Sequence, residues 1–560
     1  MSKVGAFVAS VARVVDRWRW LARSHAAQGL QLALVCLSVF TGVAVAGHQV
    51  PDLGGAHVDA RSKHQRVVRT QAGYIKGFVE NGAEQFLGVP YAKPPVGELR
   101  WANPVALEPW PEVRDATAYA SPCPQQKTLG NFSMPSVNED CLYLNVYVPR
   151  RGRKHPVMVW LHGGGSVGHG NGYDGSVLAR EQGVLVVTLN HRIGALGDLV
   201  HPAFDNGGAT TLYELRDQQF ALKWIKDNIA VFGGDPDNVT LFGESIGGAS
   251  IQLHMVSPTA KGLFHKAIFQ SGPSRYYHPL VPLAEAEARA KVFATAVGCT
   301  DQSAECLRNV PVSAILEAQG SYGGACCATF PVDDGHVLTS TVYEAIRSGQ
   351  FNRVPFLDVT NRDEHRWFLA LTEVSTSHSI AADEYPARLQ AAFGADAAIV
   401  QAAYPLSQFD SPSGALAAAQ GDRGYPCQVR NFDVDASKYV RVYAAEFNDP
   451  TSAEAVLPAV SFPYLSAHTH EIPYIFPGWK GAASDPLPPL NRQQQKLARQ
   501  MRELWATFAE TGELRDYPAL TKSREAVISL EIPRLRVITD FSETHRCQLW
   551  NSIRNWTPVP

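Results

Sequence analysis

The 560-residue sequence predicts an α/β fold, with a mostly parallel central sheet flanked by helices in a single large domain. Six short, continuously apolar segments have the length and composition of strands that are buried on both faces. They are residues 157–161, 184–189, 239–242, 267–269, 355–359 and 442–447. Longer amphipathic segments lie between several of them, an alternation that is typical of a parallel sheet covered by helices. Catalytic groups are then expected at the carboxyl ends of the strands.

Two of the amphipathic segments are predicted helices, residues 217–229 and 494–511. In the second segment, apolar side chains recur at steps of three and four residues: Leu497, Met501, Leu504, Trp505 and Phe508. That spacing places them on one face of a helix, which can pack against the sheet. No fixed-period repeat and no Ser/Gly-rich linker divides residues 47–560, so we expect one large domain there.

The first 46 residues have the pattern of a secretory signal peptide. Lys3 and four arginines precede an apolar run over residues 29–46, which ends in the small triplet A-V-A. A basic segment, an apolar segment and an A-x-A site are the three parts of such a leader. An uncleaved N-terminal membrane anchor is the alternative, because the run approaches the minimum length of a membrane span. We expect residues 47–560 to be secreted, periplasmic or otherwise extracellular, with no stable membrane association once the leader is cleaved.

Charge and cysteine content narrow the class of protein. The sequence has 50 basic and 53 acidic side chains and a formal net charge of −3, so nothing in its charge indicates a nucleic acid partner. It also has nine cysteines, an odd number. Cleavage of the leader removes Cys36 and leaves an even number, which in an exported protein is consistent with a disulfide framework.

The G-E-S-I-G motif at residues 243–247 is the strongest chemical signal. It follows the apolar segment 239–242 and precedes residues 248–253, which can continue as a helix. A sharp strand-to-helix turn exposes the serine hydroxyl, and small flanking residues permit the close backbone approach that this turn requires. We therefore predict that Ser245 is a nucleophile. A glycine-rich turn without a catalytic role is the alternative.

A second glycine-rich motif, H-G-G-G at residues 162–165, directly follows the apolar segment 157–161. Backbone N–H groups of such a loop can point at a developing oxyanion, together with the N–H of Ile246, the residue after the candidate nucleophile. A phosphate-binding loop is the alternative, but the motif lacks the G-K-[ST] ending of such loops. The sequence therefore predicts an oxyanion hole.

A nucleophilic serine needs a base, and the base needs an orienting carboxylate. In hydrolases with this strand–serine–helix turn, the acid follows the serine in the chain and the histidine follows the acid. Asp358, Asp363 and Glu364 are candidates for the acid, and His468 and His470 for the base; position alone does not separate them. A metal site is the other interpretation of the two histidines, but no H-E-x-x-H or Cys/His spacing accompanies them. We expect neither a metal nor a cofactor.

Two long motifs in this order resemble a known family. The segment E-D-C-L-Y-L-N-V-Y-V-P at residues 139–149 matches the N-terminal signature of type-B carboxylesterases. The segment F-G-G-D-P at residues 232–236, followed by Val239 and by G-E-S at 243–245, matches the active-site signature of that family up to the serine. Further similarity runs from residue 73 to residue 550. The resemblance to this carboxylesterase/cholinesterase family implies the α/β-hydrolase fold and the hydrolysis of carboxylic esters.

The resemblance also implies roles for single residues. It selects Glu364 as the acid and His468 as the base of a triad with Ser245, and it places Gly164, Gly165 and Ile246 at the oxyanion positions. It implies the disulfides Cys123–Cys141, Cys299–Cys306 and Cys427–Cys547. Cys326 and Cys327 remain, either as a vicinal disulfide or as free thiols. The implied ion pairs are Arg100 with Glu139 and Arg192 with Asp235.

Several positions depart from the family pattern. Ile246 replaces a small residue after the serine, Ser166 replaces an aromatic residue after H-G-G-G, and His191 replaces the tyrosine of an N-Y-R segment. A G-N-x-G-L-x-D-Q stretch is altered at residues 211–218. The loop between Cys123 and Cys141 contains Phe132 but no tryptophan that could stack on a choline cation, which argues against choline esters.

We therefore expect a secreted serine hydrolase that cleaves small-molecule carboxylic esters through an acyl-enzyme. One alternative is a catalytically silent, cholinesterase-like binding or adhesion protein, although adhesion members of the family typically lack the serine. The other is an amide, carbamate or lactone hydrolase with the same triad. The sequence does not separate the substrate classes, because specificity resides in loops whose shape it does not reveal.

Overall fold

The structure is a computed structural model that describes residues 65–128, 132–204, 211–273, 278–320, 331–481 and 487–553. The predicted leader, residues 1–46, lies outside the described residues, as do Cys326 and Cys327. Within the described ranges, no helix is long and apolar enough to cross a membrane.

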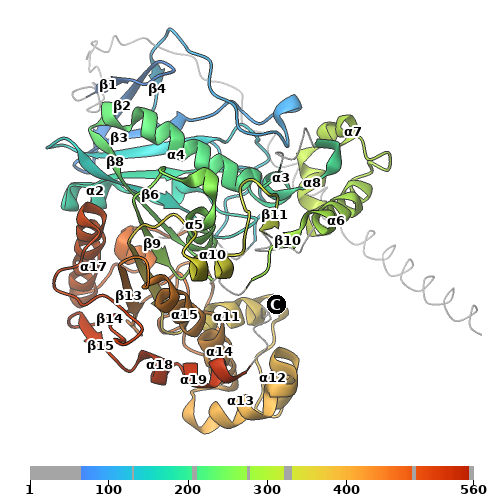
Figure 1. The fold of residues 1–560 in the computed structure, drawn as a ribbon, viewed down its shortest axis with the longest axis vertical. Coiled ribbons are helices and arrows are strands. Elements are labelled where there is room, and N and C mark those ends of the chain that lie inside the picture. The colour runs from blue at the N-terminus through green and yellow to red at the C-terminus, as the bar shows by residue number, and fades with distance from the viewer. Residues whose placement is uncertain are drawn as a thin grey trace, which may run out of the picture. The chain divides into compact units, whose positions relative to one another are not determined.

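A large, mostly parallel sheet forms the centre of the described part of the chain (Figure 1). Its parallel strands, in their spatial order, are β7 (Leu185–Leu189), β6 (His155–Leu161), β8 (Gly234–Glu244), β9 (Lys266–Gln270), β12 (Phe356–Asn361), β13 (Val442–Phe447) and β14 (Val527–Leu530). Antiparallel strands extend it at both ends: β1 (Arg66–Arg69), β2 (Tyr74–Glu80), β3 (Ala83–Pro90) and β5 (Tyr143–Pro149) beside β7, and β15 (Arg536–Ile538) beside β14. The short β4 (Arg114–Asp115) pairs with β2, and β10 (Val281–Pro282) pairs with β11 (Val332–Asp333) in a separate sheet.

The predicted fold class is confirmed, and each of the six predicted strands is present. β8 is longer than expected, because it begins at Gly234 and pairs with His155 of β6 before the apolar run starts. Both predicted helices are present as well, and both begin earlier than predicted. The helix α17 (Arg492–Thr511) starts directly after Asn491, whose side chain accepts hydrogen bonds from the N–H groups of Gln493 and Gln494. This cap satisfies donors at the first turn and sets the start of the helix.

The helices of the described residues lie on the faces of the sheet or beside it (Figure 1). They are α2 (Ser176–Gln182), α3 (Gly194–Asp198), α4 (Tyr213–Phe232), α5 (Ile246–Val256), α6 (Leu283–Ala296), α7 (Ala304–Asn309), α8 (Val312–Ala318), α10 (Val342–Ser348), α11 (His365–Thr376), α12 (Tyr385–Phe393), α13 (Ala397–Ala403), α14 (Pro412–Gly424), α15 (Pro426–Ala436), α16 (Ile472–Ile475), α17, α18 (Phe541–Thr544) and α19 (Cys547–Ser552).

The side chains of β6 show how the two faces of the sheet are covered. Val157, Val159 and Leu161 pack in one buried cluster with apolar residues of α4, α5, α10 and α15. Met158 and Trp160 alternate with them and pack in a second cluster with residues of α2, α11, α16 and α17. A strand that is apolar at every position is therefore buried on both faces, which is why these strands lack a period-two pattern in the sequence.

Disulfides join Cys123 to Cys141, Cys299 to Cys306 and Cys427 to Cys547. Arg100 donates from Nε to Glu139 at 2.7 Å, so this ion pair is present. The expected pair of Arg192 with Asp235 is wrong. Arg192 instead binds Asp217, with its Nε 2.8 Å from Oδ2 and its Nη2 2.7 Å from Oδ1. Both partners are fully buried, so this bidentate geometry compensates the loss of hydration on each side.

Candidate active site

Ser245 occupies the sharp turn between β8 and α5, with φ 55° and ψ −124°. A non-glycine residue rarely adopts such backbone angles, so packing must hold it there. Its N–H donates to the carbonyl oxygen of Gln270 at 2.9 Å. The glycine at position 247 makes the turn possible, since a Cβ atom there would lie 2.0 Å from the carbonyl oxygen of Leu161. The backbone around Ser245 is therefore packed so closely that position 247 has room only for glycine.

The H-G-G-G loop follows β6 and lies against this turn. A Cβ atom at Gly163 would lie 2.7 Å from Oε2 of Glu244 and 2.9 Å from Cβ of Ser245. Gly164 and Gly165 have φ of 105° and 68°, a region that favours glycine. Ile246, the third predicted oxyanion residue, opens α5. The loop and the first turn of α5 thus bring backbone N–H groups close to the serine.

Glu364 and His468 meet although 104 residues separate them. Glu364 precedes α11, just beyond the end of β12, and His468 lies in the segment between β13 and α16. Nδ1 of His468 is 2.6 Å from Oε2 of Glu364, and both side chains are almost fully buried. The other carboxylate oxygen, Oε1, accepts the N–H of Asn361 at 2.8 Å. Because Asn361 also donates from Nδ2 to the carbonyl oxygen of Ala467 at 2.7 Å, it ties the two segments together.

The competing acids lie in other surroundings. Asp358 is buried beside the carboxyl of Asp433 on α15, and burial raises the pKa of Asp358. Asp363 accepts the N–H of Ser466 at 3.2 Å and lies 3.6 Å from Nε of Arg366. Neither carboxylate takes the position that Glu364 holds at the imidazole.

The competing histidine, His470, also has other partners. Its Nδ1 lies 2.8 Å from Oγ of Ser452, and its Nε2 lies 3.0 Å from Oε2 of Glu454. The geometry therefore groups His468 with Glu364, and His470 with a separate pair of side chains.

Glu244 is a further residue at the site that the sequence did not identify. Its Oε1 lies 3.1 Å from Nε2 of His468, the ring nitrogen opposite the contact with Glu364. The described residues contain no hydrogen bond between the Ser245 hydroxyl and His468. Glu244 occupies the variable position before the serine in G-x-S-x-G, so the motif alone offers no signal for it. Glu244 is part of the G-E-S segment that matches the family signature, but that match does not indicate a contact with the histidine.

Aromatic side chains surround the site. The rings of Phe368 and Tyr425 lie 4.9 Å and 5.6 Å from the ring of His468. Phe132, from the loop closed by the first disulfide, lies against the H-G-G-G loop, and the ring of Trp479 packs edge-on to the ring of Phe132 at 6.2 Å. The rings of Phe368 and Tyr425 exclude water from one side of the imidazole, and aromatic side chains of this kind suit an apolar substrate group. Among the described residues, no group of three or more His, Cys, Asp or Glu side chains is placed to hold a metal ion.

Most of the chain matches a family model and proteins of known activity. A family model described as "Carboxylesterase family" matches residues 64–550. This chain belongs to the carboxylesterase family. It is 36% identical over 496 residues to the para-nitrobenzyl esterase of Bacillus subtilis (strain 168), which covers 83% of this chain and 94% of the relative. It is 34% identical over 478 residues to the fumonisin B1 esterase of Sphingopyxis macrogoltabida, covering 81% of this chain and 84% of the relative.

Solved structures agree with these sequence relatives. A structure described as PNB esterase matches with a TM-score of 0.71 and 32% identity, over 86% of this chain and 99% of the solved one. A thermophilic PNB esterase matches with a TM-score of 0.70 and 31% identity, over 87% and 99%. The prediction of a carboxylic-ester hydrolase with the α/β-hydrolase fold is confirmed.

The buried carboxyl groups of this carboxylesterase shape the proton affinity of its histidine. Burial alone lowers the pKa of His468, but the carboxylates of Glu244 and Glu364 outweigh it and raise that pKa to about 9. Burial in turn raises the pKa of Glu244 well above its usual value. Glu244 and His468 face each other as a coupled pair that shares one proton, and the pair retains this proton to higher pH than an isolated imidazole would.

Two departures of this carboxylesterase from the family pattern, His191 and the altered stretch 211–218, lie near each other. The ring of His191 stacks on the ring of His162 in the H-G-G-G motif, with centroids 4.3 Å apart and planes 4° apart. Nδ1 of His191 lies 3.8 Å from Oε1 of Glu214, which belongs to the altered stretch 211–218. Burial lowers the pKa of His191 to about 4, so both stacked rings are neutral at neutral pH. His191 and Glu214 thus pack behind the H-G-G-G loop.

Proposed function

We propose that this carboxylesterase cleaves esters with a Ser245–His468–Glu364 triad. The observation that carries the proposal is the 2.6 Å contact between Nδ1 of His468 and Oε2 of Glu364, which leaves Nε2 on the side of the glycine loop and Glu244. Glu364 would hold the ring in one orientation and stabilise its cation. Nε2 would exchange its contact with Glu244 for the Ser245 hydroxyl when substrate binds, since catalytic hydrogen bonds often tighten only in the complex.

The reaction would proceed in two halves. Oγ of Ser245 attacks the ester carbonyl carbon while its proton passes to Nε2 of His468, and the carbonyl oxygen becomes an oxyanion. N–H groups of Gly164, Gly165 and Ile246 would stabilise that charge. Collapse of the intermediate breaks the ester bond, and the alcohol leaves with the proton from His468. Water then attacks the acyl-enzyme by the same steps and releases the acid.

We further propose that the substrates carry an apolar or aromatic group next to the ester. Phe132, Phe368, Tyr425 and Trp479 around the site support this. The relatives described as para-nitrobenzyl esterase and fumonisin B1 esterase support ester chemistry of this kind. Choline esters are not proposed, because the loop between the first two bonded cysteines lacks a tryptophan for the cation.

A panel of p-nitrophenyl esters of increasing acyl length tests the proposed function. We expect turnover by the wild type and its loss, by about a thousandfold or more, in Ser245→Ala. Equal rates for the two proteins on every ester would contradict the enzymatic role of Ser245 and favour a silent binding protein. In the same assay, His468→Ala should be inactive, whereas His470→Ala should retain substantial activity. The reverse result would reassign the base.

We also propose that the protein is exported and that residues 1–46 are cleaved. The three disulfides support this, because disulfides persist in oxidising compartments. N-terminal sequencing of the protein recovered outside the cytoplasm tests it. We expect a mature protein that begins near residue 47, and an intact N-terminus on a membrane-bound protein would instead support the anchor.

A further inference from the structure

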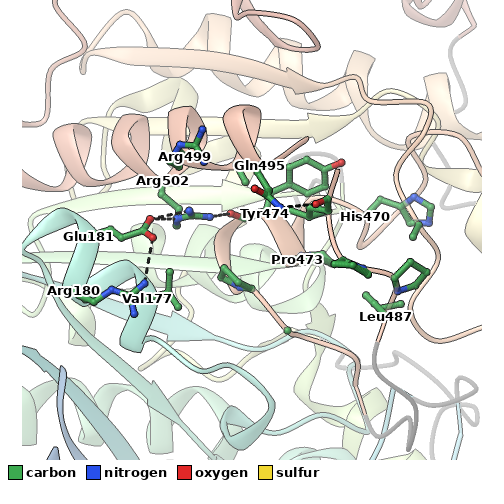
Figure 2. Close-up of a pocket in the computed structure, with 17 residues that line it drawn as sticks. Val177, Arg180, Glu181, His470, Pro473, Tyr474, Leu487, Gln495, Arg499 and Arg502 are labelled. Carbon is green, nitrogen blue, oxygen red and sulfur yellow. Dashed lines mark hydrogen bonds and ion pairs between the residues drawn. The ribbon is translucent and has the colours of Figure 1, made fainter. Parts of the chain in front are cut away.

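A pocket lies outside the candidate active site, between α2, α16 and α17 (Figure 2). Its volume is about 520 Å³, within the range of roughly 300–1,000 Å³ that is typical of small-molecule sites. None of Ser245, Glu364 and His468 lines it. His470 does line it, and this histidine is held by Ser452 and Glu454 rather than by the triad acid. The pocket is therefore a separate candidate binding site.

The charged residues that line the pocket are mostly positive. Three arginines line it, Arg180, Arg499 and Arg502, and the only carboxylate among the described lining residues is Glu181. Arg502 is fixed in the wall: its Nη2 lies 2.8 Å from Oε2 of Glu181, and its Nη1 donates to the carbonyl oxygen of Tyr474 at 2.7 Å (Figure 2). The single glutamate is thus already bound to a guanidinium, and the lining keeps an excess of positive charge.

Arg499 differs from the other two arginines. Arg180 donates to the carbonyl oxygen of Asn81 at 2.8 Å and lies 3.3 Å from Oε1 of Glu181. Arg499 is exposed on α17 and has no ion pair or hydrogen bond with any described residue. A guanidinium with unused donors binds carboxylates well, because its planar fork matches the two oxygens.

The rest of the lining is mostly apolar. Val177 of α2, Pro473 of α16, Pro477, and Leu487 and Leu490 of the segment before α17 contribute the larger apolar surfaces. An apolar wall beside a free guanidinium fits a ligand that has an apolar body and a single negative charge. Neither a small inorganic anion nor a neutral lipid would use both parts of the pocket.

We propose that this pocket binds an organic carboxylate with an apolar body, such as a medium-chain fatty acid, with its carboxylate at Arg499 and its chain against the proline and leucine wall. The inference does not rest on the proposed catalytic mechanism, since it concerns binding at residues that the triad does not use. It assigns to the carboxylesterase a second ligand site that opens beside the segment carrying His468 and His470.

Isothermal titration calorimetry with octanoate tests the proposal. The wild type should bind octanoate more tightly than it binds octan-1-ol, which lacks the charge, or acetate, which lacks the chain. Arg499→Glu should weaken the binding of octanoate at least about tenfold, because it reverses the charge at the mouth of the pocket. Arg492→Glu is the matched control on the same helix, since Arg492 is exposed and does not line the pocket, and it should bind as the wild type does.

The controls separate this site from the catalytic one. Arg499→Glu should keep the wild-type kcat/KM on p-nitrophenyl acetate and the wild-type circular dichroism spectrum, so a loss of octanoate binding would report on the pocket alone. Octanoate binding that is equal in the wild type and Arg499→Glu would overturn the proposal, as would binding of octan-1-ol that matches that of octanoate.

Discussion

The carboxyl group of Glu244 should set the pH dependence of this enzyme, and Glu244→Gln removes its charge with little change in shape. The ordinary pKa of histidine is about 6.5, and in this site it is raised to about 9. That difference corresponds to about 3 kcal/mol of preference for the imidazolium, at about 1.4 kcal/mol per pKa unit. Charges contact both ring nitrogens, at 3.1 Å from Glu244 and 2.6 Å from Glu364. Of the three carboxylates that raise this pKa, Glu244 has the strongest charge effect, ahead of Glu364 and Glu471, so removing its charge should lower the pKa of His468 by about one unit or more.

The direction of the shift in the pH profile follows from the proposed role of His468 as the base. His468 accepts a proton only when neutral, so activity rises as pH passes its pKa, and Glu244→Gln should move this acid limb of kcat/KM lower by about one unit or more. The measurement is kcat/KM for p-nitrophenyl acetate between about pH 6 and about pH 10, a range that brackets the wild-type limb near pH 9. Glu454→Gln is the matched control, because Glu454 contacts His470 and should leave the limb in place. An acid limb of Glu244→Gln that stays at the wild-type pH, or that moves higher, would refute the reasoning.

Three further predictions concern stability. Gly247→Ala places a Cβ atom 2.0 Å from the carbonyl oxygen of Leu161, so it should cost about 1–3 kcal/mol and lower both Tm and turnover; an unchanged Tm would show that the turn tolerates a side chain. Replacing both Cys427 and Cys547 by serine should lower the free energy of unfolding by about 2–4 kcal/mol in urea titrations, because the crosslink closes a long loop, and an unchanged midpoint would contradict this. Burial lowers the pKa of His545, but two adjacent carboxylates raise it to about 10. Its contribution is complete below the unfolded pKa of about 6.5 and is lost as pH rises through about 10, so the free energy of unfolding should fall over that interval in the wild type and less in His545→Gln; equal slopes would exclude it.

The sequence predicts most of the fold because its signals are local. Most strands of the parallel sheet are short apolar runs, and the glycines on either side of Ser245 indicate the sharp turn there. The start of α17 was less predictable, because it depends on the side chain of Asn491 as a cap. Likewise β8 begins before its apolar run, since pairing with β6 rather than composition decides its first residue.

The site is less predictable because its partners are distant in sequence. Nothing in the spacing of Glu364 and His468 reveals that they meet; only the family resemblance separated them from their neighbours. The same resemblance misassigned the partner of Arg192, which binds Asp217 on the adjacent helix α4 rather than Asp235. Contacts of this kind depend on how helices and loops pack in three dimensions, so the identity of the two residues alone does not predict them.

We propose above all that Ser245 carries the acyl group during turnover. Rapid mixing with p-nitrophenyl acetate, acid quenching and peptide mass spectrometry test it directly. We expect a burst of p-nitrophenol that approaches one equivalent of enzyme where deacylation is slow, together with one acetyl group on the peptide that contains Ser245. Neither should occur in Ser245→Ala. An acetyl group on another residue, or turnover of Ser245→Ala at the wild-type rate, would contradict the account.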